Sequence, residues 1–174
     1  MAAPEATIIS YGLVNPAPVI AKTILQAAAL PGMLVHVSPT PGSFDFTDSV
    51  TDYPVGYTVK STVPPTMQAI VAGGSDGTAQ TGQFIGVQAL IPGNEAYLLM
   101  GATIAVTCGD FLGPSASQGV LSPRTAAGTL ASAGIACCIA LENFGPTATA
   151  ATVGSAIRVR IIAPIYLGAG VGPT

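Results

Sequence analysis

The chain has 174 residues, and five Lys or Arg plus eight Asp or Glu make only 13 formally charged residues. The charged share is 7% and hydrophobic types reach 49%, whereas an ordinary soluble domain carries about 25% charged residues. This composition argues against intrinsic disorder and against a coiled coil, which needs charged flanking positions. It also argues against nucleic-acid binding through a basic face, because five cations on a chain of net charge −3 cannot neutralise a row of phosphates.

The N-terminal segment, residues 1–30, is expected to form an extended arm. Its prolines give no sustained period, and Asn15–Pro18 favours extended or polyproline-like backbone. Within the arm, Lys22–Leu30 has the Ala-rich composition of a short helix that stops at Pro31-Gly32, although the same residues also fit an extended chain. We expect the arm to lie over the body of the protein or over a neighbouring subunit.

Residues 31–167 carry the signals of one compact all-β body, a β-barrel, a tulip-like barrel or a sandwich. Short apolar runs alternate with turns rich in Gly, Pro, Asn and Asp, and a polar loop is expected over Ser43–Asp52. The predicted strands are Met33–Val37, Tyr57–Val63, Met67–Ala72, Gln83–Ile91, Tyr97–Thr107, Phe111–Gly113, Val120–Leu121, Ile135–Leu141 and Ile157–Leu167. Residues 168–174 are expected to be a flexible Gly-rich tail.

The clearest strand pattern is the alternation over residues 156–162. It predicts that Ile157, Val159 and Ile161 face the core. Arg158 and Arg160 then share the opposite face. Two interpretations of these arginines remain open, a solvated strand face and salt bridges to an acidic neighbour.

A second strand, over residues 135–141, is predicted to separate large from small side chains. One face is expected to carry Ile135, Cys137, Ile139 and Leu141, and the other Ala136, Cys138 and Ala140. The small face would let another layer or another subunit approach closely. Because consecutive strand residues point to opposite faces, the thiols of Cys137 and Cys138 are expected to point apart. Together with Cys108 they are expected to be buried, reduced thiols rather than a disulfide framework.

Neither a secretory signal nor a membrane span is expected. The N-terminus lacks a basic region followed by an apolar one. The longest strongly apolar stretch, Tyr97–Cys108, is far shorter than the roughly 20 residues that cross a bilayer. We therefore expect synthesis in a cytoplasm and no membrane as partner.

One motif raises an enzymatic alternative. Gly73–Gly77 reads Gly-Gly-Ser-Asp-Gly and matches the G-x-S-x-G pattern of a serine nucleophile on a sharp turn. The pattern needs a following helix, whereas Thr-Ala-Gln-Thr-Gly follows here, and the sole histidine, His36, lies upstream on a predicted strand. A hairpin turn explains the glycines, so a small hydrolase that uses Ser75 and His36 is the least favoured alternative.

Two further patterns have simpler explanations than ligand binding. Asp45, Asp48 and Asp52 could offer oxygen ligands to Ca²⁺, but they lack the spacing of an EF-hand loop and are expected to occupy a solvated loop. Gly168, Gly170 and Gly172 look like a dinucleotide-binding loop, but no helix follows to receive a phosphate. We therefore assign no catalytic residue, no cofactor-binding residue and no metal ligand.

A succession of short motifs in the second half of the chain is more informative. The motifs are Gly101-x-x-Ile-x-Val, Gly109-Asp110-Phe-Leu, Gln118-Gly119-Val120, Ala133-Gly134-Ile135-Ala136 and the final strand Ala156–Ile162. This succession resembles the small β-rich decoration, or cement, proteins on the heads of tailed bacteriophages. Those chains repeatedly show Gly-Asp-apolar-Leu, a Gly turn and a final strand of the x-Val-Arg-Val type. The entry Pro31-Gly32-Met33-Leu34-Val35 is also similar, so the resemblance covers residues 31–167.

The resemblance implies a non-enzymatic virion protein. Such proteins commonly form trimers at junctions between major capsid protein hexamers and hold the shell against internal DNA pressure. The implied partners are copies of this chain and the major capsid protein, the implied location is the capsid surface, and no cofactor is implied. The charge deficit agrees, because subunit contacts can replace solvation of the flanks. Another self-assembling phage subunit, a head fibre or a tail-tube protein, is the alternative.

Overall fold

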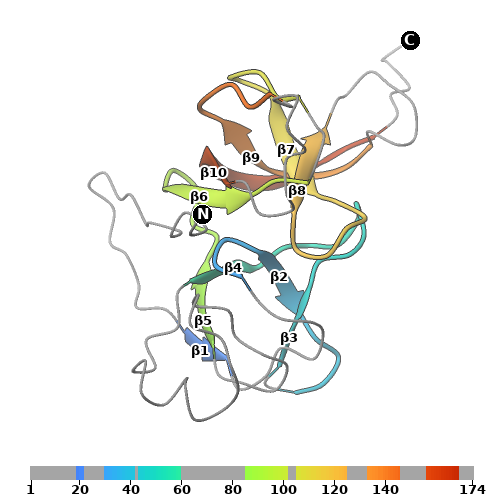
Figure 1. The fold of residues 1–174 in the computed structure, drawn as a ribbon. Helices are drawn as coiled ribbons and strands as arrows, with labels where there is room; N and C mark the ends of the chain where they lie inside the picture. The colour runs from blue at the N-terminus through green and yellow to red at the C-terminus, as the bar shows by residue number, and fades with distance from the viewer. Residues whose placement is uncertain are drawn as a thin grey trace.

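The computed structural model describes residues 19–21, 30–41, 43–59, 85–101, 105–124, 133–145 and 156–168. These residues form β-strands and no helix, so the predicted all-β class is confirmed. The strands make two five-stranded sheets in which all the paired strands are antiparallel. Figure 1 shows the two sheets as the lower and upper halves of the molecule.

The first sheet has the strand order β1-β5-β4-β2-β3 and comes from the N-terminal half of the chain. Its strands are β1 (Val19–Ala21), β2 (Leu34–Val37), β3 (Phe44–Phe46), β4 (Gly56–Val59) and β5 (Ile85–Ala89). The second sheet has the order β6-β10-β9-β7-β8. Its strands are β6 (Glu95–Leu99), β7 (Phe111–Pro114), β8 (Leu121–Arg124), β9 (Gly134–Ala140) and β10 (Ala156–Leu167).

Within the expected arm, β1 is extended and hydrogen-bonded to β5, so residues 19–21 belong to the first sheet. Two predicted elements need correction. The expected polar loop over residues 43–52 contains β3, which pairs with β2 and buries Phe46 completely. The long run Tyr97–Thr107 does not form one strand: β6 begins earlier, at Glu95, and ends at Leu99. The predictions over 22–29, 60–63, 67–77 and 169–174 lie outside the described residues.

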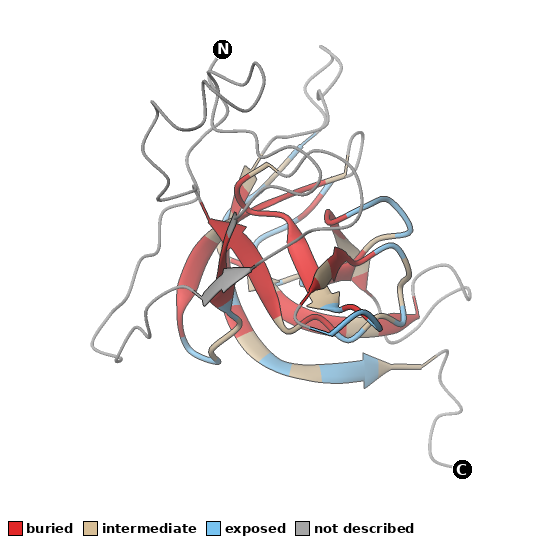
Figure 2. Ribbon diagram, turned by 90° about the horizontal axis from the view of Figure 1, so that it is seen from below, coloured by how far each residue is buried: buried red, intermediate tan, exposed pale blue. Residues whose placement is uncertain are grey.

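The two sheets share their hydrophobic core. The larger cluster joins Leu34 and Tyr57 of the first sheet to Leu98, Leu112 and other buried residues of the second sheet. The smaller cluster likewise combines residues of both halves, namely Met33, Val35, Phe46, Val87, Leu99 and Val120. Figure 2 shows much of the buried, red ribbon in the middle of the molecule and exposed segments toward its margin. Burial of apolar side chains from both halves is therefore the main contribution that holds the sheets together.

Gly32 connects the sheets through its backbone. Its N–H donates to the carbonyl of Thr58 at 2.7 Å and its carbonyl accepts from the N–H of Leu99 at 3.0 Å. The residue has a φ of +87°, and a Cβ atom there would lie 3.0 Å from the carbonyl oxygen of Tyr97. Glycine is thus favoured both by the left-handed backbone and by the closeness of β6.

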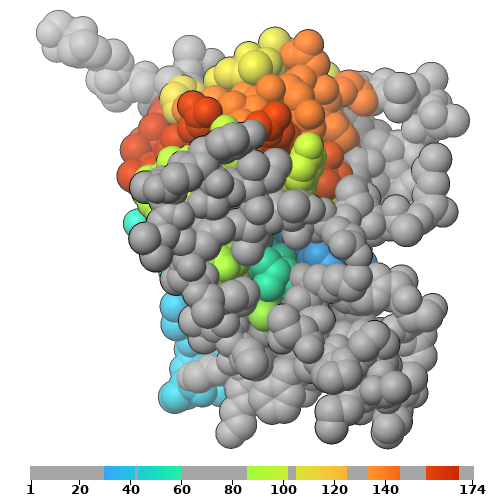
Figure 3. Space-filling model, turned by 90° about the vertical axis from the view of Figure 1, so that its left-hand side faces the viewer, coloured from blue at the N-terminus to red at the C-terminus, as the bar shows by residue number. Residues whose placement is uncertain are grey.

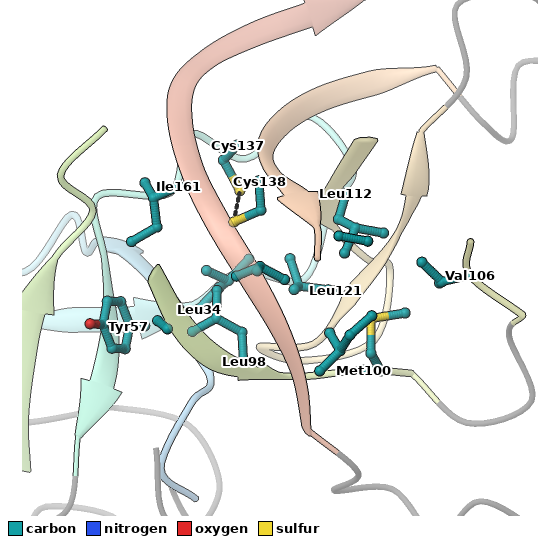
Figure 4. Close-up of a cluster of buried hydrophobic side chains, with 14 of the residues drawn as sticks. Leu34, Tyr57, Leu98, Met100, Val106, Leu112, Leu121, Cys137, Cys138 and Ile161 are labelled. Carbon is teal, nitrogen blue, oxygen red and sulfur yellow. Dashed lines mark hydrogen bonds between the residues drawn. The ribbon is translucent and has the colours of Figure 1, made fainter. Parts of the chain in front are cut away.

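The pairing of β9 with β10 is irregular around Cys137, and the extra residues lie in β10. Between the pairs Ile161↔Cys138 and Ile165↔Ala136, β10 advances by four residues and β9 by two. The small residues Ala136, Cys138 and Ala140 are fully buried, whereas the isoleucines of β9 are only half-buried. The small face therefore packs on the core, in keeping with the expected close approach of another layer. The expectation that Cys137 and Cys138 point apart is wrong, because their sulfur atoms are 3.7 Å apart in one cluster (Figure 4).

Candidate functional site

The first feature of interest is an ionic cluster on the outer face of β6 and β10. Arg160 lies directly across from Glu95 in the strand pairing, and Arg158 lies two residues away on the same face. Nε and Nη2 of Arg158 donate to Oε2 of Glu95 at 3.1 and 2.7 Å, and Nη2 of Arg160 donates to Oε1 at 2.9 Å. The backbone N–H of Arg158 also donates to Glu142 at 2.8 Å. Of the two interpretations of these arginines, the salt-bridge interpretation is confirmed.

The two guanidinium groups cover the Glu95 carboxylate. The Glu95 side chain is only 6% exposed, whereas those of Arg158 and Arg160 are 35% and 54% exposed. Hydrogen bonds from Arg160 and then Arg158 lower the pKa of Glu95 below its usual value. The cluster therefore fixes the first half of β10 against β6 with a carboxylate that stays ionised at neutral pH.

Acidification should remove the contribution of this cluster. The lowered pKa of Glu95 means that its stabilisation is present above the unfolded-state pKa, about 4.3, and is lost as the pH falls through the folded-state pKa. Glu95→Gln should lower Tm at pH 7 modestly, because both arginines are largely solvated. The Tm difference from the parent should shrink as the pH falls below about 4. Thermal melts over this range test the assignment, and a difference that stays constant with pH would contradict it.

The second feature is the far half of β10, which extends past its neighbour β6. The pairing with β6 ends at Arg160, and Ile161 makes the last backbone bonds on that side, to Asn94 and Gly93. Residues 162–167 then continue with β9 as their one paired strand among the described residues. In Figure 2 this half of β10 runs as a long arrow beyond the rest of its sheet.

The projecting half of β10 exposes apolar side chains on both faces. Ile165 is 41% exposed and the adjacent Tyr166 is 65% exposed. Since consecutive strand residues point to opposite faces, solvent reaches both sides of the strand. Residues 161–168 carry no charged side chain. An exposed apolar segment of this kind is typical of a surface that binds another molecule.

The ionic cluster and the projecting half adjoin one another along the same strand. Figure 3 shows the red side chains of β10 beside the green side chains of β6 on one face of the molecule. Arg160 and Ile161 are consecutive, so the last charged side chain of β10 directly precedes the uncharged stretch. The strand is thus anchored by ion pairs at one end and exposes apolar residues at the other.

The residues considered for catalysis are not brought together in the described residues. His36 is half-buried on β2, directly opposite Asp45 of β3. Ser75 lies outside the described residues. The prediction of a Ser75–His36 pair therefore lies outside the described residues.

The three aspartates considered for metal binding have different surroundings. Asp45 is buried in β3, at the edge of the first sheet. Oδ2 of Asp52 accepts hydrogen bonds from the backbone N–H groups of Asp48 and Ser49 at 2.8 and 2.9 Å. This is the local turn chemistry that the sequence favours for Asp. Among the described residues, no group of three or more His, Cys, Asp or Glu side chains is placed to hold a metal ion.

The cysteines require one more correction. Cys137 and Cys138 are buried free thiols, as expected, but Cys108 is exposed. Cys108 lies in a turn in which Asp110 accepts a hydrogen bond from the N–H of Thr107, and Asn143 accepts one from the N–H of Cys108. The predicted strand does not continue through Cys108. Only Val106 pairs, in an isolated bridge with Phe144, and the chain then turns, which leaves the Cys108 side chain outside the core.

Sequence reasoning missed two charged residues. Glu95 falls just before a predicted strand, and its role depends on a partner 65 residues away. Arg124 is buried at the end of β8, where Nη1 donates to Ser122 and Pro123, and burial lowers the pKa of its guanidinium. Nε and Nη2 of Arg124 have no hydrogen-bond partner in the described part of the chain. The scarcity of charged residues of both signs was the signal that could have drawn attention to these two residues.

Comparisons with known proteins do not identify a family. No protein-family model matches the chain, and no curated protein matches it either. In the described residues, no helix has the length and apolar character needed to cross a membrane.

Proposed function

We propose that this protein is a structural subunit of a tailed-phage head, which self-associates and binds the outer surface of the capsid. It would bridge major capsid protein subunits and stabilise their lattice. The observation that carries the assembly part is the projecting half of β10, with apolar side chains exposed on both faces. The phage-head part rests on the motif succession from Gly101 to Ile162, which resembles decoration proteins.

We assign the end of β10 to contact with a second copy of the chain. Residues 161–168 are uncharged, so two copies can approach there without like-charge repulsion. The nearest cation on the strand, Arg160, is already paired with Glu95. Packing of Ile165 and Tyr166 against a neighbour would remove apolar surface from water, which a chain with 7% charged residues otherwise leaves exposed.

The backbone of the same segment favours a closed oligomer over open-ended strand addition. In the pairing of β9 with β10, Tyr166 lies opposite Ile135. The N–H of Ile135 points away from β10 and donates to the carbonyl of Val50. Because the two residues of such a pair both point outward, Tyr166 directs its own N–H and carbonyl to the open edge of β10. Pro164 lies just before this segment, in the irregular stretch between Ile161 and Ile165, and has no N–H to donate. Proline on an open edge is a common means of preventing continuous edge-to-edge growth. This supports a discrete oligomer over a fibre or tube.

Binding to heads tests the proposal. The purified protein is mixed with phage heads that were assembled without it, and the heads are sedimented. We expect the protein to be found in the pellet together with the heads. Tyr166→Ser should weaken that binding, because it removes the most exposed apolar side chain of β10 and with it the oligomer. Tyr53→Ser is the matched control. Tyr53 is 59% exposed and lies between β3 and β4 of the first sheet, away from β10 in the sequence.

The outcomes separate the alternatives. Co-sedimentation of the parent and of Tyr53→Ser, with loss for Tyr166→Ser, supports the proposal. Absence of the parent protein from the pellet contradicts the capsid-binding part. Tubes or fibres of the purified protein in electron micrographs would favour a fibre or tail-tube subunit instead.

A further inference from the structure

The two adjacent buried cysteines of β9 have a geometry that a regular strand does not allow. Consecutive side chains of a strand point to opposite faces. Here the sulfur atoms of Cys137 and Cys138 are 3.7 Å apart, and both residues are fully buried. Figure 4 shows the two side chains turned toward one another beside Ile161. The approach of the sulfurs occurs where the register between β9 and β10 is irregular.

Both neighbouring strands pair irregularly with β9 next to the two cysteines. On one side β10 shifts its register opposite Cys137, between Ile161 and Ile165. On the other side Leu112 of β7 pairs with Cys138, but a Cβ placed on the next residue, Gly113, would meet the carbonyl oxygen of Ile135. The contact between the thiols therefore coincides with irregular pairing on both sides of β9.

The hydrogen bond between the sulfurs gives them different chemical roles. The thiol of Cys138 donates to the sulfur of Cys137. This hydrogen bond and burial raise the pKa of Cys138, so its proton is held more tightly. Cys137 is the acceptor, so the two sulfurs are not equivalent in this contact.

We propose that Cys137 and Cys138 form a redox-modification site in which the two thiols convert to a disulfide between adjacent residues. The oxidant is a small neutral two-electron acceptor of the azo class, such as diamide. The sulfur of Cys137 adds to one nitrogen of the N=N bond and its proton passes to the other nitrogen. The sulfur of Cys138 then attacks Cys137, the S–N bond breaks, and the Cys138 proton goes to the departing nitrogen. Two thiols lose two electrons and two protons, and the azo compound becomes a hydrazine.

The disulfide would close a small ring across the Cys137–Cys138 peptide bond. This ring would hold β9 in place where β7 and β10 pair irregularly with it. Thiols that are kept reduced in a cytoplasm would convert after release to an oxidising environment. The inference is independent of capsid binding, because it depends only on the geometry of β9.

The test uses the full chain with the exposed thiol removed, Cys108→Ser. The folded protein is treated with diamide, denatured, alkylated and weighed by mass spectrometry. We expect two alkylated thiols per chain before oxidation and none after it, with the loss of two hydrogen atoms at monomer mass. A reducing agent should restore both thiols. The same chain with Cys137→Ala or Cys138→Ala added should keep its remaining thiol free of an intramolecular bond.

A parallel oxidation in denaturant makes the result decisive. If the disulfide forms at least tenfold faster in the folded chain than in the denatured chain, the native contact promotes its formation. A tenfold rate difference corresponds to a lowering of the activation free energy by about 1.4 kcal/mol. Full retention of both thiols in the folded chain would overturn the proposal. So would a disulfide that forms faster after unfolding, or one found only between chains. Near-ultraviolet circular dichroism before and after treatment checks that the chain stays folded.

Discussion

Changing Val159 to aspartate is expected to be among the most destabilising single substitutions in this protein. Val159 is fully buried in the middle of β10, within the cluster shared by the two sheets. An aspartate there places a carboxylate among apolar side chains, away from the arginines on the opposite face of the strand. The expected loss is about 4 kcal/mol or more of unfolding free energy, which corresponds to a fall in Tm of about 10 °C or more.

Val37→Asp is the matched control, since it makes the same change on a strand where the valine is 62% exposed. This control should change the unfolding free energy by no more than about 0.5 kcal/mol. Thermal melts of the two variants and the parent decide the matter. Equal melting temperatures for Val159→Asp and the parent would show that the inward and outward faces of β10 are assigned wrongly.

Gly113→Ala is expected to have a comparable effect through sterics alone. A Cβ atom on Gly113 would lie 1.7 Å from the carbonyl oxygen of Ile135 and 2.8 Å from its carbonyl carbon. Both atoms belong to the backbone of β9, so no rotation of a side chain relieves the overlap. The strands must separate, and we expect a loss of about 3 kcal/mol or more.

The control is Gly145→Ala, because a Cβ at Gly145 has no atom within 4 Å. That variant should melt close to the parent, whereas Gly113→Ala should melt about 10 °C lower or fail to accumulate as folded protein. Near-identical melts for the two glycine variants would contradict the close crossing of β7 and β9.

The parts of the fold that were predicted correctly are those in which the sequence of a single strand shows which residues are buried. In β10, alternation placed Ile157, Val159 and Ile161 in the core and the two arginines outside, as observed. The turns rich in Gly, Pro and Asn likewise separated most of the strands of the second sheet. Local alternation is enough here because one face of the strand is buried and the other is not.

Alternation grouped the alanines and isoleucines of β9 correctly, but the pairing around Cys137 is set by neighbouring strands. Cys137 is buried together with Ala136 and Cys138, which a regular alternation does not give. The contact of β7 at Gly113 and the register shift of β10 both lie next to Cys137. Neither contact is encoded within the seven residues of β9 itself.

Strand pairing also decided the features that were missed. Phe44–Phe46 is too short and too close to polar residues to indicate a strand by itself, and it becomes β3 by pairing with β2. Glu95 becomes the partner of two arginines because β6 lies beside β10, with Glu95 opposite Arg160. The presence of an acidic neighbour was a reasonable hypothesis from the sequence, but its identity required the register.

The association state of the purified protein tests the central claim most directly. The account holds that neighbouring subunits cover the apolar end of β10 on a chain with few charged residues. Size-exclusion chromatography with light scattering at micromolar concentration should therefore give a multiple of the 17.2 kDa chain mass, and three times that mass for a trimer. Tyr166→Ser should shift the mass toward one chain. A stable parent monomer of 17.2 kDa, unaggregated at that concentration, would contradict the account.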